Sequence, residues 1–418
     1  MSTRQDQDCA VIGAGFLGLC TALQLLKHGF RVTLIDAQAP GLGASFGNAG
    51  FLATESIDPL STWATLKAAP GFLLDPHGPL KIPRGYRLAA LPWIARFGLA
   101  AWPSTVEKHR KALAALNGQA VDAWMECLAA IGRTDLMVKS GYLLAWEKQA
   151  GIKAAQESLE HLQSWGIDVD LISKHRVDEM EPEFNGCFSH ALHFASAYRV
   201  RDPKWLCEAL FANFQRQGGR FRLGKVEHLQ ISHGIPTLRI EGELQRFSKV
   251  VICAGAYSAE LLASVGISVP LIAERGYHLQ CPGLQGRITR AVCPVERRVF
   301  ISPLDSGLRI VGFSELGGIK VPPQPERYLT LKHHAKSLLP GLADEFENVD
   351  LWMGMRPTLP DSLPVIDTLP QCSNVAAAFG NQHLGLTQAA ISAKLIVARL
   401  LGDGAPNDSN PYRVNRFK

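Results

Sequence analysis

Residues 9–36 read CAVIGAGFLGLCTALQLLKHGFRVTLID. An apolar strand passes into a helix through the pattern Gly-x-Gly-x-x-Gly, formed by Gly13, Gly15 and Gly18, and a second strand ends at Asp36. Gly13 permits a tight turn, Gly15 lets the backbone approach a pyrophosphate at the helix N-terminus, and Gly18 allows helix and strand to pack closely. Asp36 can accept hydrogen bonds from an adenosine ribose. The stretch therefore predicts the first βαβ unit of a dinucleotide-binding fold.

Composition narrows the class of protein. The chain has 418 residues, 47% hydrophobic residues and a formal net charge of +5, which suits a globular protein of two or three domains. The charge is small for this length, and no zinc, KH or RRM signature is present, so nucleic acid is not an expected partner. Nine cysteines without a CxxC pair, and no signal peptide, predict reduced thiols and a cytoplasmic location. No uninterrupted apolar run is long enough to cross a bilayer.

The loop after Asp36 helps to separate the two common dinucleotides. Residues 37–50 read AQAPGLGASFGNAG, a long run of small residues. NAD enzymes usually return quickly to βαβ alternation after such an acid, so the loop favours FAD. A glycine-rich surface loop is the alternative, in which Ser45 and Asn48 only satisfy local backbone groups.

The loop closely resembles that of the D-amino acid oxidase class of FAD enzymes, and its Ser-x-x-Asn-Ala-Gly element resembles the D-amino acid dehydrogenases of that class. Two distant regions carry the same resemblance. A buried strand at 249–253 ends in the small-residue turn of Ala254 and Gly255, similar to the flavoenzyme turn that returns to the dinucleotide. Near the C-terminus, GMRPTLPDSLPVID at 354–367 and GNQHLGLT at 380–387 resemble the closing motif of the amino-acid-oxidising flavoproteins.

The resemblance covers nearly the whole chain and implies two domains. The first is an α/β Rossmann-type FAD-binding domain made of three segments, 1–60, 196–265 and 350–418. The second is an α+β substrate domain with an antiparallel sheet, made of 61–195 and 266–349. Residue alternation independently predicts strands in 275–281, 298–302 and 308–313. Asp202, Pro203 and Gly218 predict the N-cap, first turn and end of a helix.

Amine oxidation by a flavin needs a group that holds the substrate carboxylate, because the cofactor itself carries the redox chemistry. Arg356 stands where the resembled family places its substrate arginine, and its guanidinium can bind a carboxylate through two hydrogen bonds. Tyr277 follows Gly276 in a matching Gly-Tyr pair and can donate to the same carboxylate. His383 lies where the resemblance places backbone N–H groups at the flavin ring. Each of the three residues has an alternative role. Arg356 would form a structural salt bridge, Tyr277 would pack on a face of the sheet, and His383 would face solvent.

The resemblance implies non-covalent FAD, since no cysteine stands at an obvious attachment site. The residues expected to bind FAD are Gly13, Gly15, Gly18, Asp36, Ser45, Asn48, Ala49, Gly50, Val226, Ala254, Gly255, Gly380, Leu384, Gly385 and Thr387. The family often has Gly-His where this chain has Gly380-Asn381, and Asn381 can form hydrogen bonds but cannot titrate. No metal site is expected, because His333 and His334 are a lone pair rather than a set of ligands.

The resemblance implies oxidation of a D-amino acid to the imino acid by hydride transfer from Cα to the flavin. Residues 43–55 look most like the D-hydroxyproline dehydrogenase branch, which makes D-proline or cis-4-hydroxy-D-proline the expected substrate. The alternatives are a glycine or sarcosine oxidase-like enzyme and a non-catalytic FAD-binding subunit that passes electrons. Quinone, dye and oxygen all stay open as electron acceptor.

The segment 81–111 is basic and aromatic. It carries seven Lys or Arg residues against one acid, Glu107, together with Trp93, Phe97 and Trp102. One interpretation is a peripheral contact with the inner face of the cytoplasmic membrane, because such segments lie on anionic lipid surfaces. The other is a helix packed on the protein's own core with a solvated basic edge.

Overall fold

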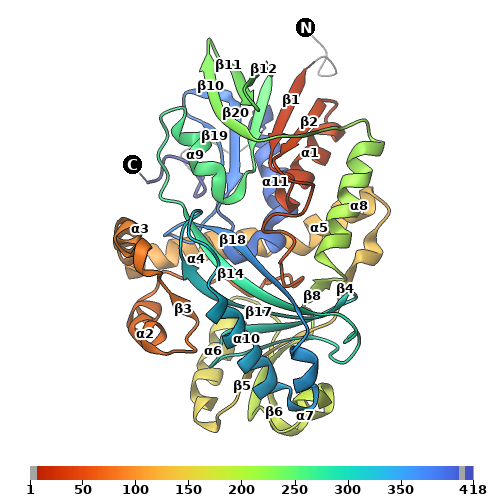
Figure 1. The fold of residues 1–418 in the computed structure, drawn as a ribbon, viewed down its shortest axis with the longest axis vertical. Helices are drawn as coiled ribbons and strands as arrows, with labels where there is room; N and C mark the ends of the chain where they lie inside the picture. The colour runs from red at the N-terminus through yellow and green to blue at the C-terminus, as the bar shows by residue number, and fades with distance from the viewer. Residues whose placement is uncertain (1–6, 404–409, 418) are drawn as a thin grey trace.

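The computed structural model describes residues 7–403 and 410–417, and its described part is built around two large sheets, with two smaller sheets and helices around them (Figure 1). The upper sheet in Figure 1 has the order β19-β20-β13-β1-β2-β9. Its strands are β19 (Val365–Leu369), β20 (Cys372–Phe379), β13 (Lys249–Ile252), β1 (Asp8–Ile12), β2 (Arg31–Asp36) and β9 (Arg220–Leu223). All neighbours pair in parallel except β19 and β20. This arrangement confirms the predicted Rossmann-type sheet.

Helices cover this sheet because its strands are apolar on both faces. They are α1 (Phe16–Lys27), α4 (Pro103–Asn117), α5 (Ala120–Ala130), α8 (Pro203–Arg216), α9 (Ser258–Ala263) and α11 (Gly385–Leu401). A small antiparallel sheet of β10 (Val226–Ser232), β11 (Ile235–Ile240) and β12 (Glu243–Arg246) lies at the top of Figure 1. The carboxylate of Asp202 accepts hydrogen bonds from Lys204 N and Trp205 N, which confirms the predicted cap of α8.

The lower sheet is mostly antiparallel, with the order β18-β14-β17-β16-β15-β5-β7-β6. Its strands are β18 (Asp350–Thr358), β14 (Ile272–Cys281), β17 (Gly307–Leu316), β16 (Val299–Leu304), β15 (Ala291–Pro294), β5 (Tyr142–Trp146), β7 (His190–Phe194) and β6 (Asp170–Ser173). The two-residue strand β3 (Leu80–Lys81) pairs with β17, and β4 (Met137–Lys139) pairs with β8 (Tyr198–Val200). The three strands predicted from alternation are confirmed as β14, β16 and β17.

Helices α7 (Lys174–Met180) and α10 (Pro325–Leu338) pack on one face of the lower sheet, in the core that holds Tyr277. Helix α6 (Ile152–Ser164) packs on the opposite face, in the core that holds Phe51 and Phe300. Helices α2 (Trp63–Leu74) and α3 (Arg87–Ala100) stand at one edge of the molecule, at the left in Figure 1.

Two segments lie elsewhere than the predicted domain boundaries place them. Strand β18 was assigned to the FAD-binding domain, but it is the edge strand of the lower sheet, paired with β14. Residues 103–130 were assigned to the substrate domain, but Trp124 of α5 is fully buried in the upper core. Its indole N–H donates to Leu386 O at 2.8 Å, and its ring meets Phe16 edge-on at a centroid distance of 6.3 Å. Apolar packing against α1 and α11 therefore decides where α5 belongs.

One helical segment of the described chain, Gln382–Leu401, is long and apolar enough to cross a membrane by length and composition. Within the fold, 67% of that segment is buried, and α11 packs against α1, α5 and β20. The segment also carries Lys394 and Arg399. Its apolar character is therefore accounted for by its place as the central helix of the upper core.

Candidate active site

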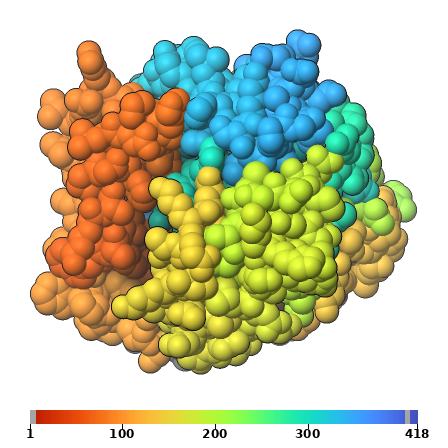
Figure 2. All heavy atoms as spheres, turned by 90° about the horizontal axis from the view of Figure 1, so that it is seen from below, coloured from red at the N-terminus to blue at the C-terminus, as the bar shows by residue number. Residues whose placement is uncertain are grey.

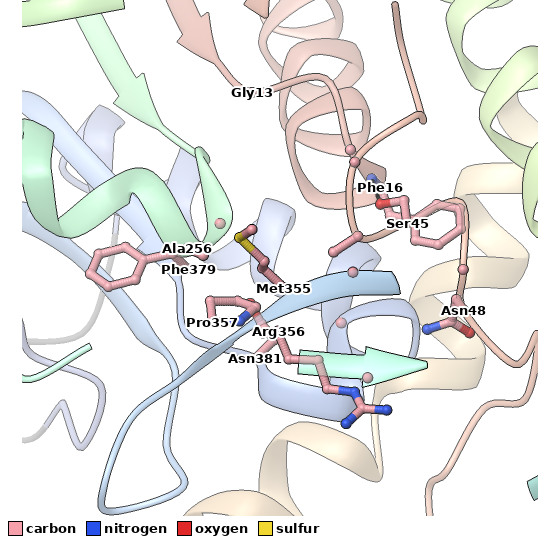
Figure 3. A pocket seen from close by; sticks show the side chains of 18 of the residues that line it. Gly13, Phe16, Ser45, Asn48, Ala256, Met355, Arg356, Pro357, Phe379 and Asn381 are labelled. Atoms are coloured by element: carbon pink, nitrogen blue, oxygen red, sulfur yellow. Dashed lines mark hydrogen bonds between the residues drawn. The ribbon is translucent and has the colours of Figure 1, made fainter. Parts of the chain in front are cut away.

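A cavity of ≈ 1050 Å³ lies between the two sheets (Figure 3). Its walls come from the first turn of α1, the ends of β2 and β13, the 43–49 loop, the inner face of β14 and β18, and the residues before α11. Pockets for small molecules commonly measure ~300–1,000 Å³, so this cavity has room for a dinucleotide together with a small substrate. The loops at the carboxyl ends of the parallel strands form one end of it, as expected for an open α/β sheet.

Two glycines of the N-terminal motif, Gly13 and Gly18, are required by the backbone around them. Gly13 has φ +105°, and a Cβ there would overlap the carbonyl of Cys253. A Cβ on Gly18 would overlap the carbonyl of Gly13, so no larger residue fits between helix and strand. Asp36 accepts hydrogen bonds from Ala14 N at 2.7 Å and Gln38 N at 2.9 Å. The acid therefore fixes the turn, and it also lines the cavity.

Ser45 and Asn48 shape the loop beside α1, as Figure 3 shows. The hydroxyl of Ser45 accepts a hydrogen bond from Phe16 N at 3.0 Å, and a Cβ on Gly15 would come within 2.9 Å of that oxygen. Asn48 Oδ1 accepts from Gly50 N at 2.8 Å. Both side chains satisfy backbone groups, which is the turn chemistry of the alternative interpretation, and both also line the cavity.

A buried arginine of the lower sheet holds this loop of the upper domain. Arg309 on β17 donates to Phe46 O at 2.8 Å and Asn48 O at 2.7 Å, while its Nε donates to Gln280 Oε1 at 2.7 Å. Burial lowers the pKa of Arg309 to about 10, and Asp202 acts in the opposite direction. Two peptide oxygens and one side-chain amide oxygen therefore accept hydrogen bonds from this buried cation, and the contact holds the 46–48 loop against β17.

The polar centre of the cavity is an arginine–glutamate pair on neighbouring strands. Arg356 of β18 stands opposite Glu274 of β14, and its Nη1 donates to Glu274 Oε1 at 3.0 Å and to Phe313 O at 2.7 Å. The guanidinium lies so close over Gly276 that a Cβ there would overlap it. Within the described residues, Nε and Nη2 of Arg356 have no hydrogen-bond partner, and Figure 3 shows the side chain extended along the cavity wall. Two donors are thus free for a ligand.

Glu274 fixes this arginine. Its carboxylate also accepts hydrogen bonds from the hydroxyls of Ser314 at 2.6 Å and Thr358 at 2.8 Å. Burial alone would raise the pKa of Glu274, but the Arg356 cation and the two hydroxyls outweigh it, so the pKa lies below its ordinary value. The carboxylate is therefore ionised at neutral pH, and it holds one edge of the guanidinium while the other edge faces the cavity.

The structure corrects the expectation for Tyr277. Alternate residues of a strand point to opposite faces, so Tyr277 points away from Gly276 and Glu274. Its side chain is fully buried behind the sheet, where its hydroxyl donates to Glu315 Oε1 at 2.9 Å and accepts from Gln324 N at 3.1 Å. The hydroxyl is therefore engaged on the far side of the sheet and does not reach a substrate carboxylate beside Arg356. Glu274, on the inner face, takes its place as the polar neighbour of the arginine.

His383 presents its side chain to the cavity in the loop before α11. Enclosure by the surrounding protein lowers the pKa of His383 to about 4; Glu274 opposes this shift and Arg356 adds to it. The ring is therefore neutral at pH 7. Asn381 also lines the cavity, but its amide nitrogen is engaged in the core, where it donates to Gln388 Oε1 at 2.8 Å.

The matches with known proteins agree with this geometry. Residues 8–399 match the family of FAD-dependent oxidoreductases known as DAO. A D-amino-acid oxidase of Bradyrhizobium diazoefficiens is 30% identical over 99% of both chains. A D-amino acid dehydrogenase of Xylella fastidiosa is 27% identical over 92% of this chain and 90% of its own. The chain belongs to the DAO family of FAD-dependent oxidoreductases.

Solved structures share the fold. Glycine oxidase from Geobacillus kaustophilus superposes with a TM-score of 0.74 over 98% of this chain and 99% of its own, at 20% identity.

The residues around the cavity fit FAD. Helix α1 begins without a capping side chain or an acid in its first turn, and so does α11. Both helix N-termini reach the cavity, where they favour the pyrophosphate and the negative charge of a reduced flavin. Gln382 has φ +52°, and its buried Nε2 has no partner among the described residues. This amide donor suits a carbonyl oxygen of the flavin ring.

The predicted FAD contacts divide into two groups. Those that line the cavity are Gly13, Gly15, Gly18, Asp36, Ser45, Asn48, Ala49, Val226, Ala254, Gly255 and Gly385. Those that do not are Gly50, Gly380, Leu384 and Thr387. The hydroxyl of Thr387 accepts from Ala53 N at 2.9 Å, Leu384 is buried in a core, and Gly380 turns the chain at φ +89°. These four shape the loops around the site, and the contacts of the first group with FAD stay predictions.

The sequence analysis missed Glu274, Arg309 and Trp352. The Trp352 ring stacks on His278 at a centroid distance of 5.0 Å and fills the space that side chains at Gly47 and Gly354 would need. Alternation along 272–281 could have placed Glu274 and Gly276 on one face. No local signal could have placed Arg309 beneath a loop 261 residues away in the sequence.

Proposed function

We propose that this chain oxidises a D-amino acid at Cα, with the substrate carboxylate bound by the free edge of Arg356. The observation that carries the proposal is the held arginine: Nη1 is engaged by Glu274 and Phe313 O, while Nε and Nη2 face the cavity. A guanidinium fixed on one edge offers two parallel donors to a carboxylate on the other. Cofactor binding alone would not call for such an arrangement.

FAD supplies the hydride acceptor when bound, and the protein supplies position. The Cα–H bond breaks as the nitrogen lone pair forms the C=N bond, so the substrate amine has to be neutral. The described residues beside Arg356 offer no positive charge to repel the amine, because His383 is neutral at pH 7. Glu274 offsets the charge of Arg356, and its ionised carboxylate can draw the nitrogen of the substrate toward this wall.

The finer proposal is that D-proline or cis-4-hydroxy-D-proline is the substrate, as the resemblance of residues 43–55 implies. Apolar rings in the same cavity support a compact apolar substrate: Phe51 and Phe300 line it and pack against each other at a centroid distance of 5.2 Å. Oxidation of a cyclic secondary amine forms a pyrroline carboxylate without losing ammonia, which distinguishes it from oxidation of D-alanine.

Anaerobic reduction of the purified yellow protein tests the substrate independently of the acceptor. D-Proline and cis-4-hydroxy-D-proline should bleach the flavin absorbance faster than D-alanine, glycine, sarcosine or L-proline at equal concentration. Bleaching by glycine or sarcosine first would favour the second candidate, a glycine oxidase-like activity, which the shared fold with glycine oxidase supports. A flavin that no amino acid reduces, while dithionite does, would overturn the proposal.

The electron acceptor is tested with the enzyme already reduced by substrate. Reoxidation by oxygen, a soluble quinone and a dye, compared by stopped flow, ranks the three acceptors left open by the sequence.

A further inference from the structure

Helix α3 is apolar on two opposite faces, and only one of them is covered by the described protein. On the inner face, Ala90 is buried and Trp93 stacks on Phe97 at a centroid distance of 5.2 Å. The indole N–H of Trp93 donates to Thr358 O at 3.2 Å, next to the arginine–glutamate pair. This contact anchors α3 to β18. A contiguous exposed apolar patch with a polar rim marks a site of contact with another molecule or a membrane.

The outer face is a continuous apolar stripe. Leu88, Leu91 and Leu99 have exposed fractions of 83%, 55% and 76%, and Trp102, just past the helix end, has 64%. Their spacings of 3, 8 and 3 residues keep them on one side of a helix, with Ala95 between them. We call these five residues the α3 stripe. Helix α2 adds Trp63 at 50% and Leu74 at 83%, and its described residues include none that is buried.

The charges around the α3 stripe are positive. At roughly 100° per residue, Arg87 and Arg96 project about 80–100° to either side of it. Lys67 on α2 and Arg84 in the turn before α3 are also exposed, and none of the four has an acidic partner among the described residues. Residues 62–102 contain one acid, Asp75. Long basic side chains beside an apolar strip can lie along it and keep their charges at its rim.

We propose that α2 and α3 form a surface that docks on anionic lipid. Leucines and a tryptophan on one line with arginines on both sides are the composition of a helix that lies in the plane of a membrane interface. The 14 residues of α3 span about 21 Å at 1.5 Å per residue, too short for the ~30 Å hydrocarbon core, so α3 lies on the bilayer. In Figure 2 these helices, coloured orange, project as a lobe at one side of the molecule, where a flat surface can reach them.

Lipid fits this surface better than a second protein. Apart from the indole N–H of Trp102, the α3 stripe has no polar group in its side chains that could pair with a protein partner. Its rim offers one sign of charge, which suits an anionic leaflet. Helix α2 touches the cavity wall: Arg298, which lines the cavity, lies over the Phe72 ring of α2, 5.0 Å from its centroid. Docking of α2 and α3 would therefore bring the cavity close to the lipid. This surface does not depend on which amino acid the site oxidises.

Co-sedimentation of the FAD-loaded enzyme with vesicles tests the proposal. The enzyme should bind vesicles of phosphatidylcholine with phosphatidylglycerol at low ionic strength, bind phosphatidylcholine alone much less, and dissociate as salt is raised. Leu88→Ser/Leu99→Ser should weaken binding by roughly tenfold or more for each leucine removed. Arg87→Gln/Arg96→Gln should reduce the preference for the anionic lipid.

The matched control is Leu244→Ser/Leu329→Ser, which removes two leucines of similar exposure, 61% and 66%, far from α3 in the sequence. It should bind as the wild type does. Enzyme that stays in the supernatant with both vesicles at low salt would overturn the proposal, and so would equal losses in both double variants. A dimer in lipid-free solution that Leu88→Ser/Leu99→Ser converts to a monomer would overturn it too, because the stripe would then be covered by a second copy.

Discussion

Replacement of Gly276 by alanine should damage the site without damaging the fold. The backbone of Gly276 lies outside the left-handed region, so alanine is conformationally acceptable there. Its methyl group would overlap the guanidinium of Arg356, which supplies the three atoms nearest to that methyl position. The end of a flexible arginine can move at little cost. We therefore expect Arg356 to be pushed away from its present position while the strand stays paired.

The size of the effect follows from the contacts at stake. A hydrogen bond to a charged group contributes about 1.5–3 kcal/mol, which corresponds to roughly 10- to 150-fold in kcat/KM if the displaced arginine loses one such bond to the substrate. Flavin content should be unchanged, and Tm should move by no more than about 2–4 °C, the shift expected for about 1 kcal/mol in a large domain. Steady-state kinetics with the best substrate, flavin absorbance and thermal melts measure all three quantities.

A double-variant cycle shows whether the methyl acts through Arg356. In an Arg356→Ala background there is no guanidinium to displace, so adding Gly276→Ala should cost nothing further in kcat/KM. Gly341→Ala is the matched control, because a Cβ there meets nothing within 4 Å. Equal losses from Gly276→Ala with and without Arg356 would refute the reasoning, since the methyl would then hinder the substrate or FAD directly. Wild-type kinetics in a folded, flavin-loaded Gly276→Ala enzyme would refute it as well.

Four further predictions address the remaining groups. Arg356→Ala should lower kcat/KM, with a loss of about 2–5 kcal/mol in transition-state binding; Arg356→Lys should lose less, because lysine keeps the charge but not the two parallel donors of the guanidinium. Equal kinetics in all three enzymes would remove Arg356 from the site. Gly15→Val should give folded protein with little FAD, measured as the ratio of flavin to protein absorbance, and full flavin content would contradict the assigned pyrophosphate position. The value of kcat/KM should rise between about pH 6 and 10 as the substrate amine loses its proton. His383, with a pKa of about 4, and Glu274, with a lowered pKa, titrate below that range and do not contribute to the rise. A flat profile would count against amine oxidation by this route. Burial raises the pKa of Glu55 from 4.5 to about 8, so between these pH values the folded state binds more protons than the unfolded state. The folded state therefore loses stability as pH rises through this range. Glu55→Gln should raise Tm more at pH 8 than at pH 5, and an equal rise in Tm at both pH values would contradict the shift.

Local features of the chain determined much of the FAD-binding half. The turn at Gly13 needs a positive φ, the Asp202 cap needs a side-chain acceptor before a helix, and alternation marks the strands of the lower sheet; each of these signals lies within a few residues. That is why the first βαβ unit, α8, β14, β16 and β17 could be predicted before the structure was known. The positions of Gly15, Asp36 and Arg356 at the cavity follow from the same short segments.

The tertiary structure decided what depends on pairing between distant segments. Glu274 meets Arg356 across 82 residues because β14 and β18 pair in one register, and that register also turns Tyr277 to the far side of the sheet. The same pairing moves β18 out of the domain that the sequence assigned to it. In the basic segment, nothing in the sequence distinguishes Trp93 from Trp102, yet the docking of α3 on β18 engages Trp93 in a hydrogen bond to Thr358 O and leaves Trp102 64% exposed. Periodicity defines the faces of a strand or helix, but only packing against the rest of the chain selects which face becomes the site and which meets the surroundings.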